Sequence, residues 1–301
     1  MLNQDKLKSV IQTLIEKEIT QFTLKGKGAV NNAYYIETID GGKYIVKQER
    51  EDKEFQPQND LLIEAKVAEQ LGKLNITVPI PKVVFKLENP KMYGYEYVEG
   101  ELLRGVWKSL SEDEKIDICR ILGKFHAEIG KKFTKEMSET IGIQIDMSAG
   151  LHPEVSVDYD RLSVDANVPE SFRTLVKEAM VIFEKSQDKL VFQFLHNDSH
   201  HENIIIKDKA ISGIIDFGNA EYGETAKEFS RYIRDFPDHF QYIISSYEEE
   251  SDNILSRERL VSNALISGFI DIVEDYWKGG ERREKAEKAI LKYRELLDRS
   301  H

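Results

Sequence analysis

A group of polar residues in the second half of the chain has the types and spacing that phosphoryl transfer needs. Asp198 follows the apolar run 190–195, and Asn203 comes five residues after it. Asp216 lies thirteen residues beyond Asn203, at the end of a second apolar run. Phosphoryl transfer requires one carboxylate beside the attacking hydroxyl, and separate oxygen ligands that hold Mg²⁺ against the phosphates. Asp198 suits the first role, and the Asn203 amide and the Asp216 carboxylate suit the second.

The order of these residues is more informative than any one of them. His196-x-Asp198 with Asn203, followed by Asp216-Phe-Gly, is the pattern of a kinase catalytic loop and metal loop. Alone, an Asp beside an Asn is usually a turn, and Asp-Phe-Gly occurs by chance. The neighbouring histidines also suggest a metal site, but the sequence has no His-x-x-x-His pair. We expect His196 to be a buried, hydrogen-bonding residue that braces the loop.

A kinase-type catalytic loop needs a phosphate-binding region earlier in the chain. Gly26 and Gly28 lie between two predicted strands, and their spacing does not match a P-loop. Lys47 ends the strand Tyr-Ile-Val-Lys, which resembles the strand that presents a lysine to the α/β-phosphates. Glu64, in the next predicted helix, is its natural ion-pair partner. The alternatives are an ordinary turn for the glycines and solvated positions for Lys47 and Glu64.

Two kinds of segment must position these residues. Residues 20–98 read as a small antiparallel sheet with one inserted helix (61–71), preceded by an amphipathic helix over 4–18, and the polar stretch 48–59 reads as a loop. From Gly100 the pattern is mostly helical, with a capping box at Ser111 and Glu114. Residues 131–168 are weakly patterned. The boundary is expected between Gly94 and Gly100.

Charge and cysteine content exclude several classes of protein. The 301 residues carry 42 Lys+Arg and 54 Asp+Glu, a net charge of −12, which disfavours nucleic acid as a partner. A single cysteine, Cys119, excludes a disulfide framework and a cysteine-based zinc site, and reads as a small buried residue. No apolar run approaches the length of a membrane span. We expect a soluble, cytoplasmic protein that contacts neither nucleic acid nor membrane.

Taken together, the motifs resemble the aminoglycoside phosphotransferase family, and within it the 2″-phosphotransferases. The resemblance rests on His196-Asn-Asp198 with Asn203, on Leu-Gly-Lys-Phe-His at 122–126, and on Tyr-Val-Glu-Gly at 97–100, and it covers about residues 20–275. It implies a two-lobe, protein-kinase-like α+β fold. The N-lobe (1–96) is an antiparallel sheet with one helix and binds nucleotide. The C-lobe (97–301) is mainly helical and carries the catalytic loop and substrate-binding helices.

The resemblance also implies roles at the phosphate end of the site. Asp198 is the general base, and Asn203 and Asp216 bind Mg²⁺. Lys47 contacts the phosphates of ATP or GTP, and Glu64 orients it, with Gly26 and Gly28 in the phosphate loop.

The expected hinge near 95–98 places three residues beside the nucleobase. Tyr95 aligns with the gatekeeper of the 2″-phosphotransferases, and Tyr97 and Val98 follow it. A bulky Tyr at this position goes with GTP use in that group, so we expect GTP to be accepted at least as well as ATP. The alternative is that Tyr93, Tyr95 and Tyr97 pack one face of the core.

A cationic acceptor would need carboxylates at separate points. The resemblance places Asp235 and Asp238 where the 2″-phosphotransferases have acidic substrate contacts, and Glu228 is a third candidate. Glu228 also stands where the family commonly has an Asp that braces the loop. The alternative for all three is a solvated acidic surface.

Three functions remain open from the sequence. The leading prediction is transfer of the γ-phosphate of a nucleoside triphosphate to a hydroxyl of an aminoglycoside antibiotic. The second is a kinase for a small metabolite such as choline, a sugar or a hydroxy amino acid. The third is a nucleotide-binding pseudokinase module, which the intact set of Lys47, Asp198, Asn203 and Asp216 disfavours.

Overall fold

Five antiparallel strands form the N-terminal sheet in the order β1-β2-β3-β5-β4. The computed structural model describes residues 4–52, 59–151, 153–187 and 190–300. The elements of this part are α1 (Gln4–Ile15), β1 (Ile19–Lys27), β2 (Asn31–Thr38), β3 (Lys43–Glu49), α2 (Leu61–Lys73), β4 (Val83–Glu88) and β5 (Lys91–Glu96). The expected loop over 48–59 is partly wrong, since Gln48 and Glu49 belong to β3; residues 53–58 lie outside the described part.

A helix covers each face of this sheet, because side chains alternate along its strands. Ile36 and Val46 pack with Leu7 and Ile11 of α1. The opposite face carries Ile45, Tyr93 and Tyr95 against Leu61 and Ala65 of α2. Lys47 is two residues after Ile45 on β3, so it points toward α2 as well.

The rest of the chain is mainly helical with short strands between the helices. Its first elements are β6 (Glu101–Leu102), α3 (Leu103–Val106), η1 (Trp107–Ser109), α4 (Glu112–Lys132), α5 (Lys135–Ile141), β7 (Gln144–Ile145), α6 (Pro153–Leu162) and α7 (Glu170–Lys185). Then follow β8 (Phe192–Leu195), β9 (Ile204–Lys207), β10 (Ala210–Ile214), η2 (Phe217–Asn219), β11 (Glu221–Glu224), α8 (Ala226–Asp235), α9 (Phe240–Ser251), α10 (Arg257–Lys278) and α11 (Gly280–Ser300).

The short strands form two small sheets around the catalytic segments. One has the order β10-β9-β6 and the other β7-β11-β8, in which β7 runs parallel to β11. Strands β8 and β9 flank residues 196–203, and β10 leads into Asp216. Both predicted catalytic segments therefore begin at strand ends.

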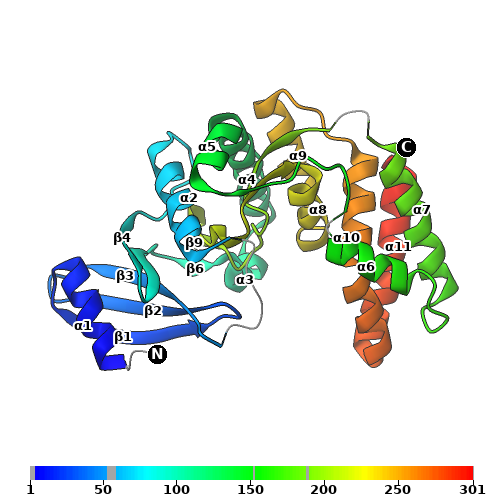
Figure 1. Cartoon of the computed structure of the whole chain (residues 1–301). Coiled ribbons are helices and arrows are strands. Elements are labelled where there is room, and N and C mark those ends of the chain that lie inside the picture. Colours follow the sequence, from blue (N-terminus) through cyan, green and yellow to red (C-terminus); the bar gives the residue numbers. More distant parts are fainter. Residues whose placement is uncertain (1–3, 53–58, 152, 188–189, 301) are drawn as a thin grey trace.

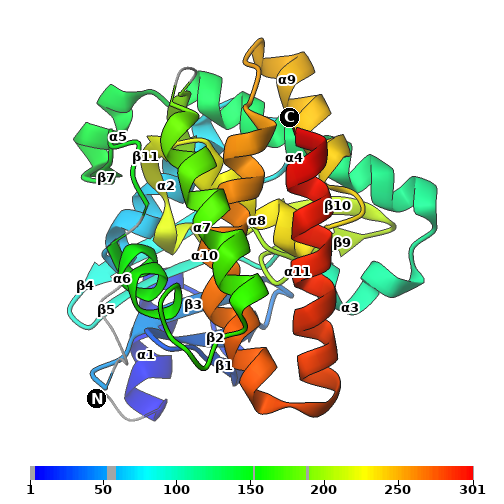
Figure 2. The same cartoon turned by 90° about the vertical axis from the view of Figure 1, so that its right-hand side faces the viewer.

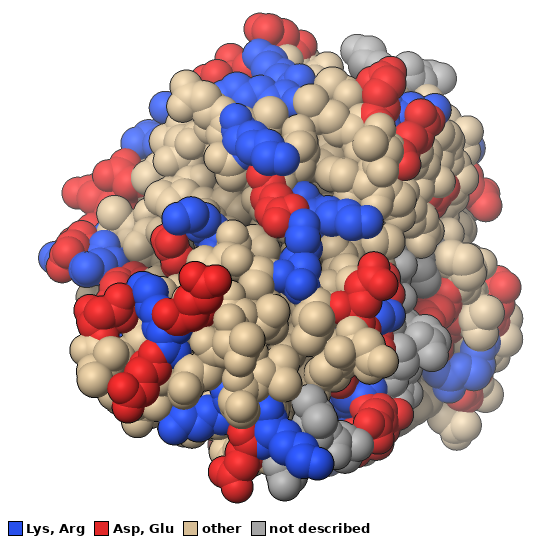
Figure 3. All heavy atoms as spheres, turned by 60° about the vertical axis from the view of Figure 1, so that its left-hand side comes forward, with Lys and Arg blue, Asp and Glu red and all other residues tan. Residues whose placement is uncertain are grey.

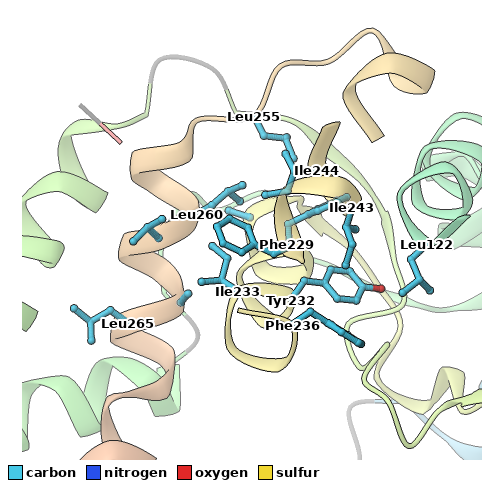
Figure 4. Close-up of a cluster of buried hydrophobic side chains, with 14 of the residues drawn as sticks. Leu122, Phe229, Tyr232, Ile233, Phe236, Ile243, Ile244, Leu255, Leu260 and Leu265 are labelled. Carbon is cyan, nitrogen blue, oxygen red and sulfur yellow. The ribbon is translucent and has the colours of Figure 1, made fainter. Parts of the chain in front are cut away.

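Figure 1 shows the N-terminal sheet at one end of the molecule and the long helices at the other. In Figure 2 helices α7, α10 and α11 lie side by side, and α10 contacts both of the others. Helix α8 packs its apolar side chains, including Phe229, Tyr232 and Ile233, against α9 and α10 (Figure 4). Cys119 is fully buried in this core, as expected.

The observed architecture confirms the predicted α+β class with an antiparallel N-terminal sheet and a helical C-terminal part. The capping box at Ser111 is also confirmed, with its hydroxyl accepting from Glu114 N and the Glu114 carboxylate accepting from Ser111 N. The weakly patterned stretch 131–168 holds α5, β7 and α6, which we did not predict. Residues 97–100 join the two parts, and a lobe boundary at residue 96 stays a prediction.

Two observations bear on the surface. Among the described residues, none of the helices combines the length and apolar character needed to span a bilayer. Basic and acidic side chains are interspersed on the face shown in Figure 3.

Candidate active site

His196 braces the loop that carries Asp198. Its side chain is fully buried, and its Nε2 lies 3.0 Å from the backbone oxygen of Ile215, just before the metal loop. The amide of Asp198 donates to His196 Nδ1 at 3.2 Å. Nδ1 therefore accepts, so Nε2 carries the proton, and burial lowers the pKa of His196 and keeps the ring neutral. These two hydrogen bonds are those expected of a buried histidine that braces the catalytic loop.

Asp198 and Asn203 contact each other directly. The Asn203 amide nitrogen donates to the backbone oxygen of Asp198 at 2.9 Å and to Oδ2 at 3.3 Å. Arg231 from α8 lies 3.1 Å from Asp198 Oδ1. Desolvation raises the pKa of Asp198, although Arg231 and His200 oppose the shift. A raised pKa suits a carboxylate that accepts a proton.

Beneath the loop lies a buried polar network that the sequence did not suggest as a unit. The Glu228 carboxylate accepts a hydrogen bond from the backbone amide of Asn197 at 2.7 Å and another from the Ser199 hydroxyl. Tyr232 OH lies 2.7 Å from Ser199 Oγ and 2.5 Å from His126 Nε2. These bonds fix the catalytic loop against α4 and α8.

Lys47, Glu64 and Asp216 meet in one cluster. Lys47 Nζ lies 2.7 Å from Glu64 Oε1 and 2.9 Å from Asp216 Oδ1. Tyr93 OH donates to Glu64 Oε1 at 2.8 Å. Burial alone lowers the pKa of Lys47, but the two carboxylates outweigh it and raise that pKa above its ordinary value. Lys47 is thus a fixed cation at the base of the site.

A cavity of about 370 Å³ brings the phosphate-binding and catalytic candidates together. Its lining includes Gly26 and Gly28, the Lys47 cluster, and Asp198. Arg50, directly after β3, holds the glycine turn by donating to the backbone oxygens of Gly28 and, at 3.3 Å, Ala29. The two parts of the chain therefore share one site.

Asn59 connects the N-terminal part to the metal loop. Its side-chain amide donates to the backbone oxygens of Gly218 at 3.1 Å and Ala220 at 2.6 Å. Sequence reasoning missed both Asn59 and Arg50, because each acts on backbone oxygens distant in sequence and no motif marks them.

The expected nucleobase residues lie apart from this cavity. Tyr95 is 6% exposed and packs against Tyr93 with ring centroids 5.6 Å apart, while Tyr97 packs edge-on against Tyr35 at 5.3 Å. Tyr97 and Val98 are partly exposed. The described residues that line the 370 Å³ cavity do not include Tyr95, Tyr97 or Val98. Their contact with a nucleobase stays a prediction.

The three acidic residues expected at the acceptor have other partners. Glu228 is 1% exposed and turned into the loop, which fits a bracing residue, and its contact with a substrate stays a prediction. Asp235 lies 3.7 Å from Arg231 Nε and 3.8 Å from His201 Nδ1. Asp238 is exposed and pairs with Lys292 at 2.6 Å, beside a cavity between α9 and α11. The structure does not bring these three carboxylates together.

Comparison with known sequences now decides the family. The profile of the phosphotransferase enzyme family matches residues 22–245, which is most of the chain and includes every catalytic candidate above. The chain belongs to the phosphotransferase enzyme family. This family transfers phosphate to hydroxyl groups, so the chain is a phosphotransferase. No curated protein sequence matches the chain significantly.

Solved structures of similar fold support the same architecture. A GDP complex of a variant aminoglycoside 2'-phosphotransferase-IIIa is 18% identical and covers 99% of this chain and 97% of its own, with a TM-score of 0.69. A macrolide 2'-phosphotransferase from Brachybacterium faecium is 14% identical, with a TM-score of 0.63; the match covers 95% of this chain and 97% of the macrolide enzyme. The streptomycin–ATP complex of APH(2")-IIa is 17% identical and covers 99% of each chain, with a TM-score of 0.58. These likenesses establish the kinase-like two-lobe fold.

The oxygen donors of this phosphotransferase fit Mg²⁺. Asn203 uses its amide nitrogen on Asp198, which leaves its Oδ1 as an acceptor. Asp216 has one carboxylate oxygen on Lys47, and its side chain is 42% exposed. Attraction from Lys47 outweighs desolvation and keeps the pKa of Asp216 below its ordinary value, so the group is ionised. Mg²⁺ takes few protein carboxylates and completes its shell with phosphate and water.

Proposed function

We propose that the protein transfers the terminal phosphate of a Mg²⁺-bound nucleoside triphosphate to a hydroxyl of a small molecule. The observation that carries the proposal is the 370 Å³ cavity, in which the Lys47–Asp216 ion pair and Asp198 face a common space beneath a glycine turn. This combination supplies a phosphate contact, a metal ligand and a base in one site.

Each residue then has a defined part in the reaction. Asp198 accepts a hydrogen bond from the acceptor hydroxyl and takes its proton as the oxygen attacks the terminal phosphorus. The new O–P bond forms as the bond from that phosphorus to the nucleoside diphosphate oxygen breaks. Lys47 contacts the donor phosphates, and Glu64 keeps it in place. Bound by Asn203 and Asp216, Mg²⁺ would neutralise charge on the phosphates.

The donor is proposed to be ATP or GTP. The similar structures named above contain GDP in one case and ATP in another. The bulk of Tyr95 supports GTP use at least equal to ATP use. Side-by-side KM values for the two donors test this, and a strong preference for ATP would refute it.

Two acceptor classes have support from different observations. An aminoglycoside is supported by the likeness to APH(2")-IIa, whose complex contains streptomycin. A small hydroxylated metabolite is supported by the charges in the site, since Glu228 is buried and Asp235 is held beside Arg231. We favour the metabolite because the residues of this chain carry that argument.

Turnover of the purified full chain tests the proposal. The chain is mixed with MgATP or MgGTP and with aminoglycosides, choline, sugars and hydroxy amino acids, and release of nucleoside diphosphate is followed. We expect release that depends on one acceptor class, with phosphate recovered on that acceptor. Nucleotide binding without turnover on any acceptor would instead indicate a pseudokinase.

A further inference from the structure

A second cavity, of about 160 Å³, adjoins the catalytic loop on the side of α8. Asn197, the residue before Asp198, lines it from the loop. Asn263 and Ser267 of α10 line the facing wall. Three cations of α8, Lys227, Arg231 and Arg234, line it together with one carboxylate, that of Glu221.

The three cations share one stripe of α8 because they are spaced four and three residues apart. The opposite side of the helix carries Phe229, Tyr232 and Ile233, and Phe236 follows directly after the helix; all four are buried (Figure 4). Core packing of that apolar side fixes the rotation of α8. The cationic stripe is therefore held toward the cavity beside the catalytic loop.

The cations differ in how far their charge is already neutralised. Lys227 is compensated by Asp146 at 2.7 Å and Glu221 at 3.0 Å. Arg231 is paired with Asp198 at 3.1 Å and lies 3.7 Å from Asp235. Arg234 has the weakest partners: a backbone oxygen of Ser267 at 3.4 Å and the highly exposed Asp271 at 3.9 Å.

Arg234 has guanidinium donors that no group in the described part of the chain uses. A guanidinium offers five N–H groups in a planar fork that matches carboxylate and phosphate. Arg231 Nε is buried and faces Asp235 Oδ2 at 3.7 Å, so Arg231 can reach a ligand only through the terminal nitrogens of its partly exposed guanidinium. Arg234 makes one long hydrogen bond within the described residues, through Nη1. An anion in the cavity would satisfy the open donors of Arg234, and the exposed end of Arg231 lines the same cavity.

We propose that the acceptor carries a carboxylate or phosphate group, bound by Arg231 and Arg234, in addition to the hydroxyl that is phosphorylated. This rests on the proposed function and names its substrate class. Arg231 contacts both the cavity and Asp198, so an anion bound there places the rest of the acceptor beside the base. A polycationic acceptor would instead meet the cationic stripe of α8.

The size of the cavity agrees with a small acceptor group. Drug-sized ligands occupy cavities of about 300–1,000 Å³, whereas this one is about 160 Å³. It is large enough for the anionic end of a hydroxy acid or a sugar phosphate.

Binding is measured first, independently of turnover. The full chain is loaded with Mg²⁺ and a non-hydrolysable triphosphate analogue. It is then titrated by calorimetry with two matched pairs of three and six carbons, glycerate against glycerol and glucose 6-phosphate against glucose, and separately with the polycation kanamycin. We expect one anionic class to bind at least about tenfold more tightly than its neutral partner, the effect of charge-assisted hydrogen bonds. The pair in which the anionic member binds more tightly shows whether the cavity prefers a carboxylate or a phosphate.

Variants of Arg234 link that binding to the cavity. Arg234→Met should weaken the anionic ligand by about tenfold or more and leave the nucleotide KM unchanged, and Arg234→Lys should recover part of the loss. Arg282→Met, the same change at an exposed position of α11, should alter nothing. Thermal melts show whether each variant is folded.

The two proposals fail in different ways. Equal binding of anionic and neutral partners, absence of binding by every anion, or an unaffected Arg234→Met would overturn the anionic-acceptor inference even if another acceptor turns over. Anion binding that depends on Arg234, with no phosphate transfer, would support the inference and overturn the proposed function.

Discussion

Asn203 donates its side-chain amide to Asp198, 2.9 Å from the backbone oxygen and 3.3 Å from Oδ2. The proposed base and the proposed metal ligand are therefore held by each other before any substrate arrives. His196 braces the same loop from the metal-loop side and Glu228 braces it from α8. Such preorganisation means that the site needs little rearrangement at the moment of reaction.

Replacing the base should separate chemistry from binding. Asp198→Asn keeps the shape of the side chain but removes the proton acceptor, so kcat should fall by roughly 10²–10⁴-fold. Nucleotide affinity should stay near that of the wild type, because Lys47 and Asp216 are unchanged. Steady-state turnover and nucleotide titration measure the two quantities.

The matched control for this change is Asp208→Asn. Asp208 is exposed in the turn between β9 and β10 with φ of 50°, a conformation that Asn tolerates. It should leave both quantities unchanged. Wild-type turnover by Asp198→Asn would remove Asp198 from its assigned role.

The metal prediction concerns Asp216. In Asp216→Ala only the Asn203 oxygen remains of the two proposed protein ligands, so Mg²⁺ should no longer increase triphosphate affinity. Titration of each protein with triphosphate in Mg²⁺ and in EDTA measures this. If Mg²⁺ strengthens binding equally in both proteins, Asp216 is not a ligand.

The parts of the site that could be predicted are those marked by local sequence patterns. Strand ends before Asp198 and Asp216 follow from apolar runs, and the pairing of Lys47 with Glu64 follows from the likeness of Tyr-Ile-Val-Lys to the lysine-bearing strand of kinases and from the helix after it. The helices over 135–162 were missed because their amphipathic pattern is weak and their stability comes from tertiary packing.

The acceptor side could not be predicted because it depends on which side chains are buried. A sequence does not show that Glu228 is turned inward while Arg231, three residues later, reaches Asp198. Arg50 and Asn59 were missed for a related reason, since their partners are backbone oxygens brought near only by folding.

Acid should destabilise the protein partly through His126. Burial lowers its pKa to about 3, against about 6.5 in an unfolded chain. Between these values the unfolded state binds a proton that the folded state does not, so the unfolding free energy falls as pH drops below about 6.5. His126→Gln removes this proton.

Urea unfolding of both proteins between pH 6 and 4.5 measures the effect. The variant should lose about 1.4 kcal/mol less per pH unit than the wild type. The comparison uses the slopes, because the lost bond to Tyr232 lowers the stability of the variant at every pH. Identical slopes would mean that His126 is protonated in the folded protein.

A buried ion pair between α10 and β11 gives the largest predicted stability effect. Arg259 donates to both carboxylate oxygens of Glu224, at 2.9 and 2.8 Å, and to the backbone oxygens of Phe183 and Ala149. Both charged side chains are at most 4% exposed. Arg259→Met leaves Glu224 as a buried charge without its partner and should lower the unfolding free energy by about 3–5 kcal/mol.

The matched control is Arg257→Met, two residues earlier. This change breaks a more exposed ion pair with Glu248 and should lower the unfolding free energy by about 1 kcal/mol or less. Urea titrations that give equal losses for the two variants would contradict the special weight assigned to burial of the Arg259–Glu224 pair.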